Sequence, residues 1–99
     1  AVIESDTDAI RANHYHDDDW HLSYLVSGSM KYQWKDSLDS VETKEVIVQA
    51  GQMIYSPSGV PHKMIFLERS IFIAVAALSR SKENYESDTH RLAEDFFNV

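Results

Sequence analysis

The chain has no cysteine, and this absence removes several kinds of site at once. Disulfide bridges, thiolate zinc sites and cysteine nucleophiles are excluded, so any metal site must use nitrogen and oxygen ligands. Basic residues are scarce: nine Lys and Arg stand against sixteen Asp and Glu, for a formal net charge of −7. This acidic balance argues against nucleic acid or an anionic membrane as a partner.

Long apolar runs are missing as well. The longest, from Ile71 to Leu78, has the length of a strand, whereas a membrane span needs roughly 20 residues. The first residues, Ala1 to Asp8, lack the basic start and apolar block of a signal peptide. We therefore expect a soluble cytoplasmic protein with no membrane partner. With no internal repeat or linker, the 99 residues predict a single domain, 1–99.

Alternation of apolar and polar residues is the most regular pattern in the chain. It runs from Met30 to Lys35, as expected of a strand with one buried face. Further strands are predicted at 9–16, 20–26, 46–48, 53–55, 62–67 and 70–77. Turn-forming residues such as Gly28 and Pro57 separate them, which is typical of an antiparallel sandwich or barrel. The polar tail, 79–99, breaks the pattern, and 88–97 is expected to form a helix or a strap over the barrel.

Four of the five histidines are spaced like metal ligands. His14 and His16 lie two residues apart, so on a strand their imidazoles project from the same face. His21 begins the next predicted strand, and His62 follows the turn 57–61. Neutral imidazole binds zinc, iron, nickel, copper and manganese. Taken alone, the segment is equally compatible with a polar loop, because it also contains three consecutive aspartates, 17–19.

Two patterns in the chain resemble the two motifs of the cupin family. The first is His14-x-His16, four residues, His21, six residues, Gly28. The second is Gly51, five residues, Pro57-x-Gly59, two residues, His62. Seven positions match at two independent spacings, and the resemblance extends over 14–77. It implies an all-β fold, the antiparallel double-stranded β-helix or jelly-roll cupin barrel, with motif 1 at 14–28 and motif 2 at 51–62. It also implies one divalent metal ion (Zn, Mn, Fe or Ni), with His14, His16, His21 and His62 as ligands.

The chain departs from the family motifs at three positions. Asp8 replaces the opening glycine of motif 1, Phe66 replaces the asparagine after the last histidine, and His21 replaces the usual glutamate. Either His21 completes a four-histidine site, or a ligand has been lost and the barrel holds no metal. We favour four histidines, because loss of function gives no reason to install another good ligand. Four neutral imidazoles would leave the full 2+ charge on the ion to stabilise a substrate oxyanion.

The resemblance leaves several functions open. We expect a metal-dependent isomerase, epimerase, cyclase or lyase that acts on a small oxygenated or carbohydrate-like molecule. A dioxygenase acting on a chelating dicarbonyl-type substrate and a non-catalytic small-molecule sensor are the alternatives. The candidate acid–base groups are the phenols of Tyr55 and Tyr24. We expect a homodimer, because one face of strand 20–26 is apolar and cupins commonly pair through a sheet. The candidate substrate-pocket residues are Ser23, Gln33, Met64 and Phe66.

Overall fold

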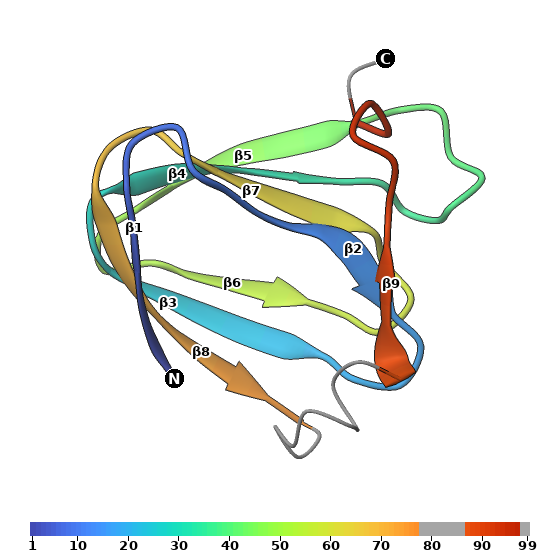
Figure 1. The fold of residues 1–99 in the computed structure, drawn as a ribbon, viewed down its shortest axis with the longest axis horizontal. Helices are drawn as coiled ribbons and strands as arrows, with labels where there is room; N and C mark the ends of the chain where they lie inside the picture. Colours follow the sequence, from blue (N-terminus) through green and yellow to red (C-terminus); the bar gives the residue numbers. More distant parts are fainter. Residues whose placement is uncertain (78–86, 98–99) are drawn as a thin grey trace.

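Two antiparallel sheets face each other in the computed structural model, which describes residues 1–77 and 87–97 (Figure 1). One sheet has the strand order β1-β8-β3-β6 and the other the order β5-β4-β7-β2-β9. The all-β antiparallel fold predicted from the sequence is confirmed. The strands are β1 (Val2–Ser5), β2 (Ile10–His16), β3 (His21–Ser27), β4 (Ser29–Trp34), β5 (Lys44–Gln49), β6 (Met53–Ser56), β7 (His62–Phe66), β8 (Ser70–Ala76) and β9 (Thr89–Arg91).

All seven predicted strands correspond to observed ones, and two further strands were not predicted. β1 pairs with β8 and begins the first sheet. β9 comes from the tail and pairs with β2, with His16 opposite Thr89 and His14 opposite Arg91. Within residues 1–77 and 87–97, no helix combines the length and apolar character that a membrane crossing requires.

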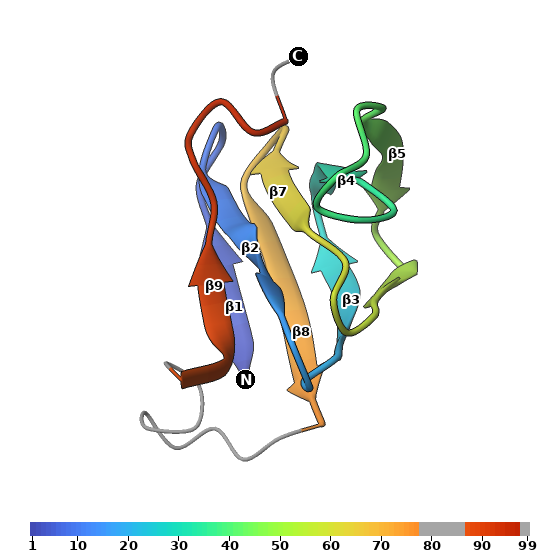
Figure 2. The ribbon, with the colours of Figure 1, turned by 90° about the vertical axis from the view of Figure 1, so that its right-hand side faces the viewer.

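The described part of the C-terminal tail forms the predicted strap. Figure 2 shows β9 in red along one edge of the barrel, beside β2. Residues 94–97 then form a turn, and buried Phe97 ends the described strap. Residues 79–86 and 98–99 of the predicted tail lie outside the described residues.

The apolar faces of the two sheets meet in one core. Phe66 from β7 and Phe72 from β8 stack across it with ring centroids 5.5 Å apart. Each large side chain buried in this way contributes roughly 1.5–3 kcal/mol. Phe66, at the position of the motif asparagine, thus supplies packing. The buried cluster consists of Leu25, Met30, Tyr32, Val48, Met64, Phe66, Phe72 and Ala74.

A β-bulge in β2 decides which of its side chains point into the barrel. Ala12 and Asn13 have φ angles of 65° and 56°, in the left-handed region. The register shifts there, so that Ala12 faces Lys63 whereas His14 faces His62. In a regular strand Asn13 would face His62 and His14 would point outward. The extra residue therefore turns His14 and His16 inward.

Gly28 of motif 1, in the turn from β3 to β4, is needed for close packing against Arg69 and Ser70. Its φ is +88°, and a Cβ added there would lie 2.7 Å from the carbonyl oxygen of Arg69. A larger residue would have to push the β7–β8 turn away, so this motif glycine serves the fold and not the site.

Candidate metal centre

Three histidines from β2 and β7 meet inside the barrel. The ring centroids of His14 and His16 lie 4.5 Å apart, and those of His14 and His62 lie 4.9 Å apart. All three residues are buried, and each offers a ring nitrogen within 4.8 Å of the other two. Because His14 faces His62 directly across the two strands, one ion could contact all three rings.

Backbone carbonyls fix the tautomers of two of these rings. His16 Nδ1 lies 3.1 Å from the carbonyl oxygen of Asp88, and His62 Nδ1 lies 3.0 Å from that of Val60. A carbonyl oxygen only accepts, so in both residues Nδ1 must donate its hydrogen. The lone pair of the neutral ring is then on Nε2, where it is available to a metal ion.

The surroundings hold the three rings in the neutral form that metal binding requires. Burial, reinforced by His62, His16, His21 and Arg91, lowers the pKa of His14 to about 2. Burial also lowers the pKa of His62 to about 4, against the opposing effect of the Val60 carbonyl. Burial is also the largest cause that lowers the pKa of His16, and the neighbouring His21 lowers it further. No proton therefore needs to leave His14 or His62 at neutral pH before an ion binds.

His21 belongs to a second group of side chains beside the first. Its ring centroid is 4.6 Å from that of His16, and its Nε2 lies 2.9 Å from Asp19 Oδ2. The other carboxylate oxygen of Asp19 accepts hydrogen bonds from the backbone N–H groups of Trp20 and Ala77. His16, Asp19 and His21 form a possible ligand set of their own. To bind the same ion as His14, His16 and His62, His21 would have to use Nδ1 or give up its hydrogen bond to Asp19. Its role as a fourth metal ligand therefore stays a prediction.

A cavity of about 140 Å³ is lined by His14 and His62 of this cluster and by His21. Of the residues predicted to form the substrate pocket, Ser23 and Met64 line it. Arg11 also lines it. The sequence does not predict this, because a period of two places Arg11 and His14 on opposite faces of an unbulged strand. The lining residues are Ile3, Arg11, Ala12, His14, His21, Ser23, His62, Met64, Phe72 and Ala74.

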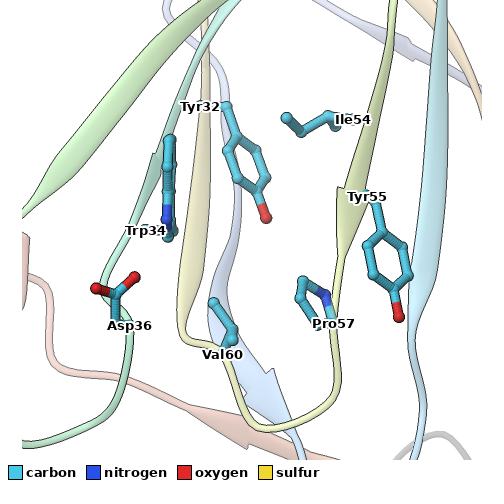
Figure 3. Close-up of a pocket in the computed structure, with 7 residues that line it drawn as sticks. All are labelled: Tyr32, Trp34, Asp36, Ile54, Tyr55, Pro57 and Val60. Carbon is cyan, nitrogen blue, oxygen red and sulfur yellow. The ribbon is translucent and has the colours of Figure 1, made fainter.

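Tyr32 lines a second cavity, of about 290 Å³ (Figure 3). Its ring stacks on His62 with centroids 5.8 Å apart, and its hydroxyl lies 2.7 Å from Ser56 Oγ. Burial raises the pKa of Tyr32 to about 12, so the phenol is a neutral hydrogen-bonding group. In Figure 3, Trp34 lies on one side of the second cavity and Pro57 on the other. The cavity is lined by Tyr32, Trp34, Asp36, Ile54, Tyr55, Pro57 and Val60.

Four other predicted site residues do not meet the three histidines. Tyr24 and Tyr55 lie on the outer face of the first sheet, 39% and 53% exposed. Gln33 lies on the opposite face of β4 from Tyr32, and its amide donates to Glu45 Oε1. Phe66 packs in the core. Within residues 1–77 and 87–97, the buried phenol that stacks on one of these histidines is Tyr32, not Tyr24 or Tyr55.

The fold and the histidine cluster together define a two-sheet antiparallel barrel with a candidate metal centre in its interior. The model of the cupin domain family matches residues 2–75, most of the chain. The protein belongs to the cupin family, and the resemblance drawn from its two motifs is confirmed. No curated protein matches the chain significantly.

Solved structures of longer proteins share this fold. The capsular polysaccharide assembling protein CapF from Staphylococcus aureus superposes with a TM-score of 0.82 at 20% identity, over 92% of this chain and 27% of its own. A single-residue variant of oxalate decarboxylase from Bacillus subtilis gives 0.76 at 27% identity, over 92% of this chain and 23% of its own. Another structure of that decarboxylase is described by its Mn(II) centres. The chain spans about a quarter of the length of these proteins.

Proposed function

We propose that the protein is a divalent-metal-dependent enzyme whose substrate is a small oxygenated acid. The observation that supports this most is the meeting of two buried, neutral imidazoles, His14 and His62, with Arg11 at a single small cavity, beside the ring of His16. Titratable residues with strongly shifted pKa values in a cleft are candidates for a functional site.

The cavity limits the size and charge of the substrate. Its volume of about 140 Å³ is close to that of an engineered cavity of roughly 150 Å³ that binds benzene in another protein. Arg11 is the cationic residue of its lining, and its Nε and Nη2 are held by Ser5 Oγ and the Glu4 carbonyl oxygen. Guanidinium groups bind carboxylates through paired hydrogen bonds. A hydroxy acid or oxo acid of a few carbons fits better than a whole sugar ring.

The residues around the cavity suggest a division of labour. A bound divalent ion would polarise a carbonyl oxygen and stabilise negative charge on it. Arg11 would hold the carboxylate of the substrate, and the buried hydroxyl of Ser23 would bind a second oxygen. His21 would accept a proton at Nδ1, because its Nε2 hydrogen is directed at Asp19. Met64 and Phe72 add apolar surface to the cavity lining.

Chemistry of the lyase or isomerase type is the proposal, and manganese is the proposed ion. The likeness at 27% identity to a decarboxylase, an enzyme that acts on a small acid, supports both choices. The oxidative alternative differs in one measurable respect: a dioxygenase consumes oxygen during turnover. An oxygen electrode therefore decides between the two, and uptake matching turnover would exclude the proposed class.

The test combines metal analysis with substrate binding. Protein loaded with Mn²⁺ is titrated with oxalate and with pyruvate as probes, and the Arg11→Gln variant is compared with it. Loss of one charge-assisted pair, worth about 1.5–3 kcal/mol, predicts roughly 10- to 150-fold weaker binding. Arg69→Gln is the matched control, since Arg69 is an exposed arginine paired with Glu4 and Asp6. Wild-type protein that binds no divalent ion, or an Arg11 variant that binds both acids normally, would contradict the proposal.

We also propose that the protein forms a homodimer through the outer face of the first sheet. Apolar side chains meet in register across it: exposed Tyr24 lies between Ile73 and Met53, and half-buried Leu22 lies between Val75 and Tyr55. A continuous apolar face of this kind is typical of an interface. Analytical ultracentrifugation should show a dimer that Tyr24→Lys dissociates. Val41→Lys, at an apolar residue that is 89% exposed in the β4–β5 loop, should leave it intact. A monomeric wild type would exclude the interface.

A further inference from the structure

The C-terminal strap is tied to the strand that carries two of the histidines. It lies outside residues 2–75, the part of the chain that the family model matches. β9 pairs with β2 directly opposite His14 and His16. Beyond β9, Asn13 Nδ2 donates to the carbonyl oxygens of Leu92 and Ala93, at the bulge that turns the histidines inward. The strap thus contacts β2 at both the bulge and the histidine pair.

Asp88, at the start of the strap, organises the loop between His16 and His21. Its Oδ1 accepts hydrogen bonds from the backbone N–H groups of Asp17 and Asp18 at 3.1 and 3.2 Å. Its Oδ2 accepts from those of Asp18 and Asp19 at 3.3 and 2.9 Å. Burial raises the pKa of Asp88, but the three N–H groups outweigh this and leave the pKa below its usual value. A negative charge is thus held inside an acidic loop by backbone dipoles.

The same residue also orients one of the imidazoles. The backbone carbonyl oxygen of Asp88 accepts the Nδ1 hydrogen of His16. The carboxylate anchors the loop, and the anchored backbone then holds His16 with its Nε2 lone pair directed to the cluster. Val60 does the same for His62, but from a residue two positions away in the chain. For His16 the partner is 72 residues away.

We propose that Asp88 is a positioning residue for the metal centre, through which the strap fixes the tautomer of His16 and the course of loop 17–19. The inference rests on the proposed metal centre. On this proposal the motif residues alone do not complete the metal centre, because the C-terminal strap must also be packed against β2. Loss of a hydrogen-bond partner of this kind typically lowers metal affinity about 10- to 100-fold.

The experiment measures Mn²⁺ binding by calorimetry in four proteins: wild type, Asp88→Ala, Asp88→Asn and Asp95→Asn. Asp95 is an exposed strap residue, so its variant controls for the loss of one negative charge. Asp88→Ala is expected to weaken Mn²⁺ binding about 10- to 100-fold. Asp88→Asn keeps one acceptor oxygen, so its Mn²⁺ affinity should lie between those of Asp88→Ala and wild type. Asp95→Asn should bind Mn²⁺ as tightly as wild type does. Nitrogen-15 NMR of the metal-free proteins should show His16 as the Nδ1–H tautomer in wild type and as a mixture in Asp88→Ala.

His62→Ala separates failure of this inference from failure of the proposed function. If His62→Ala binds Mn²⁺ as wild type does, the metal centre itself is wrong. If His62→Ala loses the ion while both Asp88 variants keep wild-type affinity and the wild-type His16 tautomer, the role of Asp88 is wrong and the centre stands. Should Asp88→Ala fail to fold, the Asp88→Asn protein decides by the same two readouts.

Discussion

Acid should destabilise the metal-free protein through its buried histidines. Burial and the neighbouring imidazoles lower the pKa of His14 to about 2 and that of His62 to about 4, from an ordinary value of 6.5. Below pH 6.5 the unfolded chain takes up protons on these rings, whereas the folded chain keeps them neutral. The unfolded state then binds more protons, so the free energy of unfolding falls as the pH falls.

The size of the effect follows from the two lowered pKa values. Each ring that stays neutral only in the folded state lowers the free energy of unfolding by about 1.4 kcal/mol for every pH unit below its unfolded pKa. Between pH 8 and pH 5 this amounts to about 2 kcal/mol per ring, or about 4 kcal/mol for His14 and His62 together. The loss begins near pH 6.5, and it continues down to about pH 4 for His62 and about pH 2 for His14. Such a loss is a large part of the roughly 5–15 kcal/mol that stabilises a typical domain.

Urea unfolding at pH 8, 6.5 and 5, with a chelator present, measures this directly. The comparison is with the double variant His14→Gln/His62→Gln, whose amides do not titrate. Asp and Glu titrate in both proteins, so their contribution cancels in the difference. Wild type should lose about 4 kcal/mol more than the variant between pH 8 and pH 5. Equal losses in the two proteins would refute the lowered pKa values.

Two further predictions concern the residues that hold the histidines in place. Tyr32→Phe should lower the free energy of unfolding by about 1–3 kcal/mol, because it leaves the buried hydroxyl of Ser56 without its partner. Adding Ser56→Ala should restore most of the loss in urea unfolding, and additive losses would show that the two hydroxyls do not interact. Ala12→Gly should stabilise the protein by up to about 1 kcal/mol, since glycine adopts the φ of 65° freely. Ala12→Val should destabilise it and weaken Mn²⁺ binding in calorimetry, whereas a normal Ala12→Val protein would show that the bulge is not needed.

The barrel could be predicted from the sequence, because strand alternation is a local pattern and the two motifs have fixed spacings. The alternation from Met30 to Lys35 predicted β4, and the motif spacings predicted the barrel and the family. His14 and His16 were expected to share a face from a period of two, and they do so because the bulge lies before them at Asn13. The same bulge explains why Arg11 was missed. A bulge formed by Ala and Asn, without glycine, leaves no clear signal in the sequence.

The parts that escaped prediction depend on contacts between distant segments. Asp88 lies 72 residues from His16, and no spacing rule connects a polar tail with a histidine in the barrel. The choice of Tyr24 and Tyr55 as candidate phenols rested on proximity to motifs in the chain. Tyr32 lies beside His62 because β4 pairs with β7, a long-range pairing that periodicity alone does not specify. Asp19 was considered only together with Asp17 and Asp18, although its carboxylate is the partner of His21.

The location of a bound ion tests the central claim most directly. Crystals grown with Mn²⁺ would be measured at a wavelength where manganese scatters anomalously, and the anomalous difference map would show where the ion lies. We expect one strong peak per chain, within coordination distance of His14, His16 and His62. A map without a peak there, or one whose only peak lies at Asp17, Asp88 and His90, would contradict the proposed metal centre.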